Sequence, residues 1–445
     1  MDEILKQVLT KVTPTPQEHE RELKLADLFI KKLTRKDVKP MLVGSLAKKT
    51  DLRGDKDIDI FILFNPGVGR DDLEKRGLAL GRELFTKLKA KYEIDYAEHP
   101  YVMGRYKDYD VEIVPCYSGD KILSSVDRTP MHTHYIKRKL LGANQLRGEI
   151  RLLKQFMKGA GVYGAEAKVQ GFSGYLVELL TIHYGSFQNV LKATADWKFG
   201  DIALDPEKQW EDPSVLKHFF TNAELIVVDP VDKDRNVAAA VSKQKLAEFI
   251  IASAEFLKNP ALEYFFPTVK KPRSEKELAK NIRERGTLLL AFAFKHGKVN
   301  PNSLYDQIRA TERALKQEIE EYEFSIFRSG FWTNEKNTSV ILLEFDVWNL
   351  PKIKHHPGPP IDVDPANQER FLEKYKTDKP YIKDGRWVVN TEREFKSVGE
   401  LLPQILKERK GFGKELRTAK FSVLKNKELL RLKENSFRKY LDTFL

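Results

Sequence analysis

Cysteine is almost absent from this sequence: Cys116 is the single one among 445 residues, so no disulfide can form within the chain. One cysteine also excludes a cysteine-rich zinc site and fits a reducing compartment, so we expect a cytoplasmic protein. No apolar run approaches the ~20 residues of a membrane span, and no membrane partner is expected. The opening residues, MDEILKQVLTKV, lack an apolar core and a small-residue cleavage site, so we expect no signal peptide.

Acidic residues are the minority charge. The chain has 65 Asp and Glu against 77 Lys and Arg, which gives a net charge of +12, and 11% of its residues are aromatic. A basic, aromatic-containing chain favours nucleic acids or nucleotides as partners. The length suggests about three domains, with enough residues to bury a large core.

The first ~140 residues mix helical and strand patterns. Thr15–Glu18, with the sequence TPQE, is a capping box that predicts the start of a helix. Alternating apolar residues predict strands at 57–64 and 109–114, the second closed by Pro115. Between these strands, apolar residues at helical spacing predict a helix over residues 70–92.

The rest of the chain changes character twice. Residues 147–258 have a predominantly helical pattern, and strand-like runs return at 287–294 and 339–348. The Asp384-Gly385 pair between two short apolar segments predicts a hairpin turn. Residues 352–360, KIKHHPGPP, are expected to hold no regular structure.

Two carboxylates stand out on the first predicted strand. Asp57 and Asp59 are two residues apart, so both leave the same face, while Ile58 and Ile60 point toward the core. Such a pair suits two hard divalent cations that align an attacking hydroxyl with a leaving phosphate. A third carboxylate is needed, and Glu112 lies on the other predicted strand.

A bare Asp-x-Asp is more often the solvated face of an edge strand. Here, however, Gly44 and Ser45 end an apolar run 12 residues before the pair. Glycine permits close backbone approach, and the serine hydroxyl with nearby N–H groups can hold a triphosphate tail. The combination favours a nucleotide site.

Gly-Ser, Asp-Ile-Asp and a Glu between apolar residues resemble the signature of the DNA polymerase β nucleotidyltransferase superfamily. More closely, the chain is similar to the archaeal-type (class I) CCA-adding tRNA nucleotidyltransferases. The matching blocks cover about residues 40–240: VGSLAKKTDLRGDKDIDIFILF, AEHPYVMG, VEIVPCY, VDRTPMH, RLLKQFMKGAGVYGAEAKVQGFSGYLVELL and VVDPVDKDRNVAA. Beyond residue 260 only short pieces match.

This resemblance implies an activity and an architecture. The activity is template-independent addition of C, C and A to the 3′ end of tRNA from CTP and ATP, with two Mg²⁺ ions and release of pyrophosphate. The fold is multidomain α+β. It has a polymerase-β-like nucleotidyltransferase head at 1–142, a helical central domain completing the nucleotide pocket at 143–258, and an α/β tRNA-binding region at 259–445. The resemblance leaves open whether the protein forms a homodimer.

The resemblance also implies residue roles. Asp57 and Asp59 match the family's metal-binding pair, and Glu112 matches the third carboxylate, which is usually Asp. Asp110 leaves the same face two residues earlier and competes for that role. The expected nucleotide contacts are Gly44, Ser45, Lys48, His132, Lys154 and Tyr163, together with Arg235 as a reader of base edges.

Pattern alone favours plainer roles for four of these residues. Lys154 would be a solvated lysine on an amphipathic helix, and His132 an ordinary surface histidine. Tyr163 would be a core aromatic with a satisfied hydroxyl. Arg235 would pair with a neighbouring acid, Asp229 or Asp232.

The C-terminal stretch carries much of the net charge. Residues 401–445 hold 12 basic and 5 acidic residues, with Phe412, Phe421 and Phe437 interleaved. Since the resemblance implies an RNA substrate, we expect this stretch to contact the backbone of a folded RNA.

Two rival functions remain. One is a poly(A)-polymerase-like terminal transferase. The blocks VDRTPMH and DPVDKDRNVAA favour CCA addition over this function. The other is a catalytically silent RNA-binding protein of the same fold. The intact set of carboxylates, Asp57, Asp59 and Glu112, favours an active enzyme instead.

Overall fold

The structure is a computed structural model that describes residues 1–96, 98–119, 121–268 and 271–445. The chain forms two compact units, residues 1–269 and 270–445. Within the described residues, no helix has the length and apolar character needed to cross a membrane. Helices and strands occur in both units, as expected for an α+β fold.

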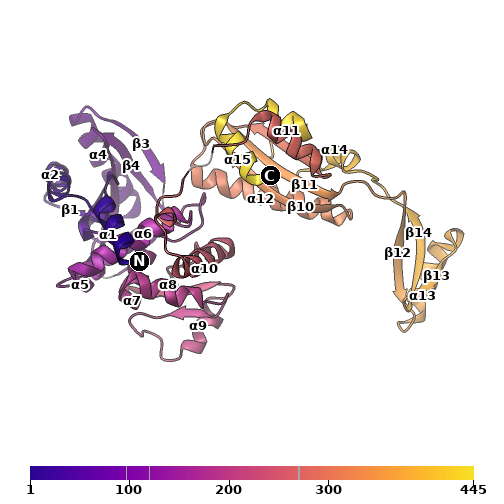
Figure 1. The fold of residues 1–445 in the computed structure, drawn as a ribbon, viewed down its shortest axis with the longest axis horizontal. Helices are drawn as coiled ribbons and strands as arrows, with labels where there is room; N and C mark the ends of the chain where they lie inside the picture. The colour runs from indigo at the N-terminus through magenta and orange to yellow at the C-terminus, as the bar shows by residue number, and fades with distance from the viewer. Residues whose placement is uncertain (97, 120, 269–270) are drawn as a thin grey trace. The chain divides into compact units, whose positions relative to one another are not determined.

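A five-stranded sheet forms the N-terminal part of the first unit, in the order β1-β2-β5-β4-β3. The β2 and β5 strands are parallel, and every other neighbouring pair is antiparallel. The helices α2 and α4 pack on one face of this sheet, as Figure 1 shows for α4 beside β4. The bounds are β1 (Val38–Leu42), β2 (Asp57–Phe64), β3 (Lys91–Tyr96), β4 (Pro100–Tyr106), β5 (Tyr109–Tyr117), α2 (Pro16–Leu33) and α4 (Arg70–Lys87).

Local signals set several of these elements. Thr15 caps α2 through the predicted capping box with Glu18, and Pro16 occupies the first turn. Strand β2 matches its predicted range. Its alternation separates the two faces, because Ile58 and Ile60 are buried in the core under α2 and α4.

Two predicted boundaries were wrong. Helix α4 ends at Lys87 rather than running to Tyr92, because Lys89 has a φ of 51° and the chain turns into β3. Strand β5 continues through Pro115 rather than stopping there. The pairing of β4 with β5 extends only to Ile113, so the missing N–H of Pro115 costs no bond to β4.

The remainder of the first unit is a helical core with a small sheet. Aromatic residues dominate its centre, and Phe156 packs among Phe187, Phe256 and Phe265. The sheet β6-β7-β8 was not predicted. The bounds are α1 (Asp2–Val12), α3 (Gly44–Lys48), α5 (Arg128–Lys139), α6 (Asn144–Gly159), α7 (Gly174–Tyr184), α8 (Phe187–Ala195), β6 (Ile202–Leu204), α9 (Pro213–Phe219), β7 (Leu225–Asp229), β8 (Asp232–Asn236) and α10 (Lys243–Lys258).

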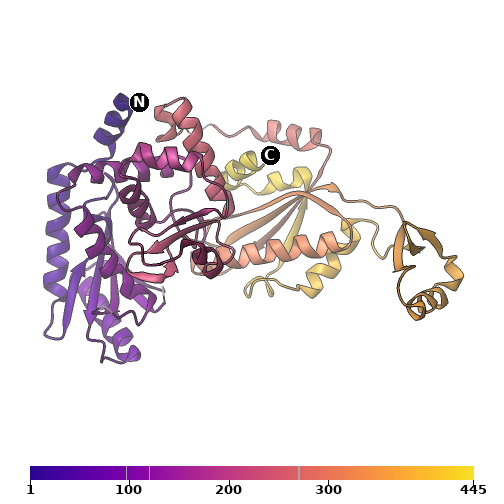
Figure 2. The ribbon, with the colours of Figure 1, turned by 90° about the horizontal axis from the view of Figure 1, so that it is seen from below.

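The second unit is built on a four-stranded antiparallel sheet, β10-β11-β9-β15. Helices α12 and α14 cover one face, and α11 and α15 cover the other, which explains why β9 and β11 are nearly continuous apolar runs. Figure 2 shows α12 lying along this sheet. The bounds are α11 (Glu275–Glu284), β9 (Leu288–Lys295), α12 (Pro301–Glu321), β10 (Ser325–Thr333), β11 (Thr338–Val347), α14 (Val398–Glu408), β15 (Phe421–Lys425) and α15 (Asn435–Phe444).

A second sheet in this unit, β12-β14-β13, corrects the expectation for residues 352–360. That segment forms β12 (Ile353–Pro360), which pairs with β14 (Arg386–Glu392) and packs against α13 (Pro365–Lys374). Its prolines are tolerated because β12 is an edge strand with an irregularity between Pro357 and Pro360. The predicted Asp384-Gly385 turn does join β13 (Tyr381–Lys383) to β14, with both residues at positive φ.

The C-terminal stretch is part of the core of this unit. Phe412 and Phe437 are each 1% exposed, and β15 completes the four-stranded sheet. These two phenylalanines are therefore packed inside the protein, and RNA contact by the other residues of this stretch stays a prediction.

Candidate active site

The three predicted metal-binding carboxylates lie on neighbouring parallel strands. The register places Asp59 opposite Glu112 and Asp57 opposite Asp110. Because partners in a parallel pair leave the same face, all four carboxylates are on the face opposite α2 and α4. Phe61 continues this face as part of a small apolar cluster.

These carboxylates repel one another, and Asp59 and Glu112 are half-buried whereas Asp57 is exposed at the start of β2. Burial, with the charge of Asp57, raises the pKa of Asp59 to about 6. Burial, with the charges of Asp59 and Asp57, raises the pKa of Glu112 to about 7. Burial and the charges of Asp55 and Asp110 also raise the pKa of Asp57. Clustered carboxylate oxygens are the donors that hard divalent cations prefer, so the residues fit such an ion.

Asp110 differs from Glu112 in its surroundings. Its side chain is exposed at the start of β5 and lies 3.9 Å from the guanidinium of Arg105. Glu112 is more enclosed and faces Asp59 directly. The structure thus gives the two competing carboxylates distinct environments.

Gly44 lies against the carboxylate of Asp59. It has a φ of +72°, and a Cβ built on it would be 1.9 Å from Asp59 Oδ2. The residue begins α3, and half-buried Ser45 follows it, with its carbonyl accepting the N–H of Thr50 at 3.0 Å. Glycine is therefore required for the chain to pass close to the strand carboxylate.

Glu178, on α7, forms ion pairs with two of the lysines that are predicted to contact the nucleotide. This carboxylate is fully buried, and it lies 2.6 Å from Lys48 Nζ and 3.4 Å from Lys154 Nζ. Thr50 completes the cluster, since its hydroxyl donates to Glu178 at 2.5 Å and its carbonyl accepts from Lys154 at 2.9 Å. Lys154 is thus buried in an ion network and is not a solvated lysine.

Burial shifts the pKa values of both the carboxylate and the lysine in this cluster. Burial raises the pKa of Glu178, but the ion pairs with Lys48 and Lys154 outweigh it and the pKa is lowered overall. Burial lowers the pKa of Lys154. We conclude that Glu178 is ionised and neutralises part of the lysine charge.

Tyr163 lies beside the Glu178 cluster. A Cβ built on Gly174 would be 3.0 Å from the Tyr163 hydroxyl and 4.0 Å from Lys154 Nζ. Both polar groups therefore lie near the first residue of α7. The tyrosine is half-buried, and burial raises the pKa of its hydroxyl.

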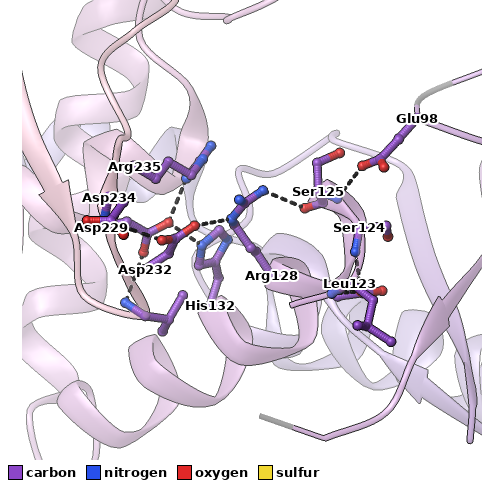
Figure 3. Close-up of polar contacts among 12 residues, drawn as sticks. Glu98, Leu123, Ser124, Ser125, Arg128, His132, Asp229, Asp232, Asp234 and Arg235 are labelled. Atoms are coloured by element: carbon purple, nitrogen blue, oxygen red, sulfur yellow. Dashed lines mark hydrogen bonds and ion pairs between the residues drawn. The ribbon is translucent and has the colours of Figure 1, made fainter. Parts of the chain in front are cut away.

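Three further side chains form hydrogen bonds with Asp229, which lies at the end of β7, and Figure 3 shows two of them. The carboxylate is fully buried and accepts hydrogen bonds from His132 Nε2 at 2.8 Å and Arg235 Nη1 at 2.7 Å. Tyr175 donates to its other oxygen at 3.1 Å, and its ring stacks on His132 with centroids 3.8 Å apart. His132 is thus an enclosed, oriented residue, and Arg235 does pair with Asp229.

The contacts of Asp229 and His132 shift the pKa values of both side chains. Burial raises the pKa of Asp229, but hydrogen bonds and the charges of its partners outweigh burial and lower the pKa overall. Burial lowers the pKa of His132 despite the neighbouring carboxylate.

Arg128 ties α5 to the same small sheet. Its Nε donates to Asp232 at 2.7 Å, and Nη1 lies 3.5 Å from the Ser125 carbonyl, contacts visible in Figure 3. The helix that carries His132 is therefore anchored next to β8, the strand that carries Arg235.

Glu178 was missed in the sequence, and Asp229 was considered there only as a possible partner of Arg235. Glu178 is the one acid in the apolar run YLVELLTI, and Asp229 ends the apolar strand LIVVD. A charge inside an apolar run is rarely buried without a partner, which is the signal that would have identified both.

Residues 24–139, which carry the paired strand carboxylates and the closely packed glycine, match the family model "Nucleotidyltransferase domain", so the site belongs to the class of nucleotidyltransferases. Residues 148–266 match "tRNA nucleotidyltransferase, second domain", and residues 285–426 match "CCA-adding enzyme, C-terminal domain". The chain is 37% identical to the CCA-adding enzyme of Methanosarcina barkeri, over 98% of this chain and 96% of that one. It is 39% identical to that of Methanocaldococcus jannaschii, over 91% of each chain. The chain belongs to the family of CCA-adding enzymes.

Proposed function

We propose that this protein adds C, C and A to the 3′ end of tRNA from CTP and ATP, releasing pyrophosphate in each step. The observation that carries the proposal is the register of β2 and β5, which sets Asp59 opposite Glu112 beside Gly44. Family membership over nearly the whole chain supports tRNA as the acceptor. We place the reaction in the cytoplasm, which the single cysteine, Cys116, favours.

The catalytic groups follow from that register. Asp57, Asp59 and Glu112 would hold two Mg²⁺ ions, which lower the pKa of the attacking hydroxyl and neutralise charge on the leaving phosphate. Glu112 is assigned the third position rather than Asp110, because Glu112 lies directly opposite Asp59, whereas Asp110 lies beside Arg105. Gly44 keeps the backbone clear of Asp59.

The nucleotide is assigned to the surrounding groups. Ser45, Lys48, Lys154 and Tyr163 would contact the triphosphate, with Glu178 aligning the two lysines. His132 and Arg235 would contact the nucleotide from the Asp229 cluster, with Arg235 reading the base edge. A carboxylate that accepts from the guanidinium restricts its orientation, which favours hydrogen-bond selection between bases.

The domain roles are part of the proposal. Residues 1–142 would form the catalytic head, residues 143–258 would complete the nucleotide pocket, and residues 259–445 would bind tRNA. The burial of the His132–Asp229–Arg235 contacts between α5, β7 and β8 supports a pocket shared by the first two segments.

The test is transfer to tRNA that lacks CCA, with Mg²⁺ and each labelled nucleotide in turn. We expect CTP alone to add two residues, ATP to add one after them, and UTP and GTP to be poor substrates. Long A tails would instead identify a poly(A)-polymerase-like enzyme, and binding of tRNA without transfer would identify a silent RNA-binding protein.

Matched variants test the carboxylate assignment. Glu112→Gln should reduce transfer at least 100-fold, about 2.7 kcal/mol of barrier, whereas Asp110→Asn should retain most activity. A larger loss of transfer in Asp110→Asn than in Glu112→Gln would instead identify Asp110 as the third ligand. Asp59→Ala should abolish transfer, and retention of more than about a tenth of wild-type turnover, ~1.4 kcal/mol, would contradict the metal assignment.

A further inference from the structure

A second group of metal-ligating side chains lies away from the strand carboxylates. His19 and Glu22 are three residues apart on α2, so they share a face of that helix. Asp51 belongs to the loop between α3 and β2. One ligand atom from each of the three lies within 4.8 Å of the other two.

Asp51 lacks the partners that a buried carboxylate needs. Its side chain is 5% exposed, and within the described residues neither of its oxygens has a hydrogen-bond partner. The Nε2 atom of His19 is also buried and has no partner there. Buried polar groups are normally hydrogen-bonded, paired or bound to a metal, so two of the three donors point to a ligand.

The neighbouring cation, Arg151, forms a long ion pair with Asp51 but no hydrogen bond to its carboxylate. Arg151 donates from Nε to the carbonyl of Asp51 at 2.8 Å and from Nη2 to the carbonyl of Lys49 at 2.7 Å. The distance from its Nη2 to Asp51 Oδ1 is 4.0 Å, which is too long for a hydrogen bond. The guanidinium therefore holds the loop by its backbone and leaves the carboxylate oxygens unbonded.

Burial disfavours the ionised forms of the two carboxylates, so an ion would bind there by displacing their protons. Burial, with the charges of Asp51 and Glu18, raises the pKa of Glu22 to about 7. Burial also raises the pKa of Asp51. Burial lowers the pKa of His19, which keeps its imidazole neutral, the form that binds metals.

The donor set selects the kind of ion. One imidazole and two carboxylates suit Zn²⁺ or Mn²⁺, whereas Mg²⁺ and Ca²⁺ prefer oxygen donors alone. Atoms bound to one tetrahedral ion at ~2.1 Å lie ~3.4 Å apart, so small side-chain rotations would close the three donors around it.

We propose that His19, Glu22 and Asp51 bind a divalent transition-metal ion, with Zn²⁺ as the preferred occupant, separate from the ions assigned to the strand carboxylates. Such an ion would join α2 to the loop that follows α3. Thr50, next to Asp51, binds both Glu178 and Lys154. The ion would therefore stabilise the position of the loop that supports the Glu178 cluster.

The test is Zn²⁺ binding by the full chain, measured by calorimetry. An Asp57→Asn, Asp59→Asn background removes two carboxylates that would compete for the ion. We expect one Zn²⁺ per chain and at least a tenfold rise in Kd when either His19→Gln or Asp51→Asn is added. The control is His218→Gln, an exposed histidine on α9, which should leave Kd unchanged.

Thermal unfolding gives a second readout. Zn²⁺ should raise the Tm of the background protein and of His218→Gln, but not that of His19→Gln. Absence of Zn²⁺ binding, or equal Kd values for His19→Gln and His218→Gln, would overturn the proposal. If Asp51→Asn fails to fold by circular dichroism, Glu22→Gln takes its place, since that side chain is only half-buried.

Discussion

Gly44 and Asp59 are in such close contact that a Cβ on the glycine would lie 1.9 Å from the carboxylate oxygen Oδ2. The positive φ of Gly44 adds ~1–2 kcal/mol for any other residue. Two unrelated constraints thus fix glycine at one position, and both concern the placement of a proposed metal ligand.

Gly44→Ala should therefore inactivate the enzyme without unfolding it. The added methyl group must displace either Asp59 or the start of α3, so we expect transfer to fall at least tenfold, about 1.4 kcal/mol of barrier. Single-turnover CTP incorporation, beside circular dichroism, measures this. The matched control is Gly54→Ala, whose Cβ would meet nothing within 4 Å although its φ is also positive. Equal loss in both variants would attribute the effect to backbone strain alone.

Arg235→Ala should erode discrimination against UTP and GTP more than it slows transfer of CTP and ATP. A site built to hydrogen-bond a base rejects analogues that leave its groups unpaired. Asp229→Asn should act in the same direction, because it weakens the contact that orients the guanidinium. The comparison is kcat/KM for all four nucleotides, with Asp234→Asn, an exposed side chain on the same strand as Arg235, as the control. A uniform loss for every nucleotide would assign Arg235 to phosphate binding or to structure.

Glu344→Gln should destabilise the second unit by about 2–3 kcal/mol at pH 7. This fully buried carboxylate accepts from Arg285 and Thr287, and Arg328 binds its other oxygen. Amide hydrogen exchange within residues 285–345 at increasing urea measures the loss. Glu392→Gln, which removes an exposed ion pair with Lys352, should have little effect.

The same carboxylate predicts a pH dependence. Burial raises the pKa of Glu344, but hydrogen bonds from Arg285, Thr287 and Arg328 outweigh it and lower the pKa overall. A lowered pKa gives stability that is fully present above the unfolded value of about 4.3 and is lost as pH falls through the folded value. The difference between wild type and Glu344→Gln should therefore shrink below about pH 4. A constant difference would contradict an ionised Glu344.

Neutralising exposed lysines in the C-terminal stretch should weaken tRNA binding and flatten its salt dependence. Deleting residues 401–445 would remove core residues, so we choose Lys420→Gln, Lys427→Gln and Lys439→Gln, which alter exposed side chains. Each lost phosphate contact should reduce the log–log salt slope by somewhat under one. CTP affinity should not change. The control triple Lys31→Gln, Lys32→Gln and Lys75→Gln lies on α2 and α4, and an equal effect there would make the charge loss non-specific.

Local patterns predicted a large part of the fold. The capping box at Thr15, the alternation along β2 and the Asp384-Gly385 hairpin each depend on neighbours in sequence, and each is present. Residues 352–360 failed as a prediction because their pairing partner, β14, lies some 30 residues later. A proline-rich segment becomes a strand only when a distant segment supplies its hydrogen bonds and leaves it at the edge of a sheet.

By itself the sequence determined that Asp57 and Asp59 share a strand face, because side chains alternate along an extended chain. It also marked Gly44 as a point of close backbone approach, but the pairing of β1 with β2 is what sets this residue beside Asp59. Only the tertiary structure set Glu112 opposite Asp59 and left Asp110 exposed, since register between strands is a long-range property. The roles of Glu178 and Asp229 were decided in the same way: a buried carboxylate requires cations or donors from other elements, and those partners are brought to it by packing rather than by sequence distance.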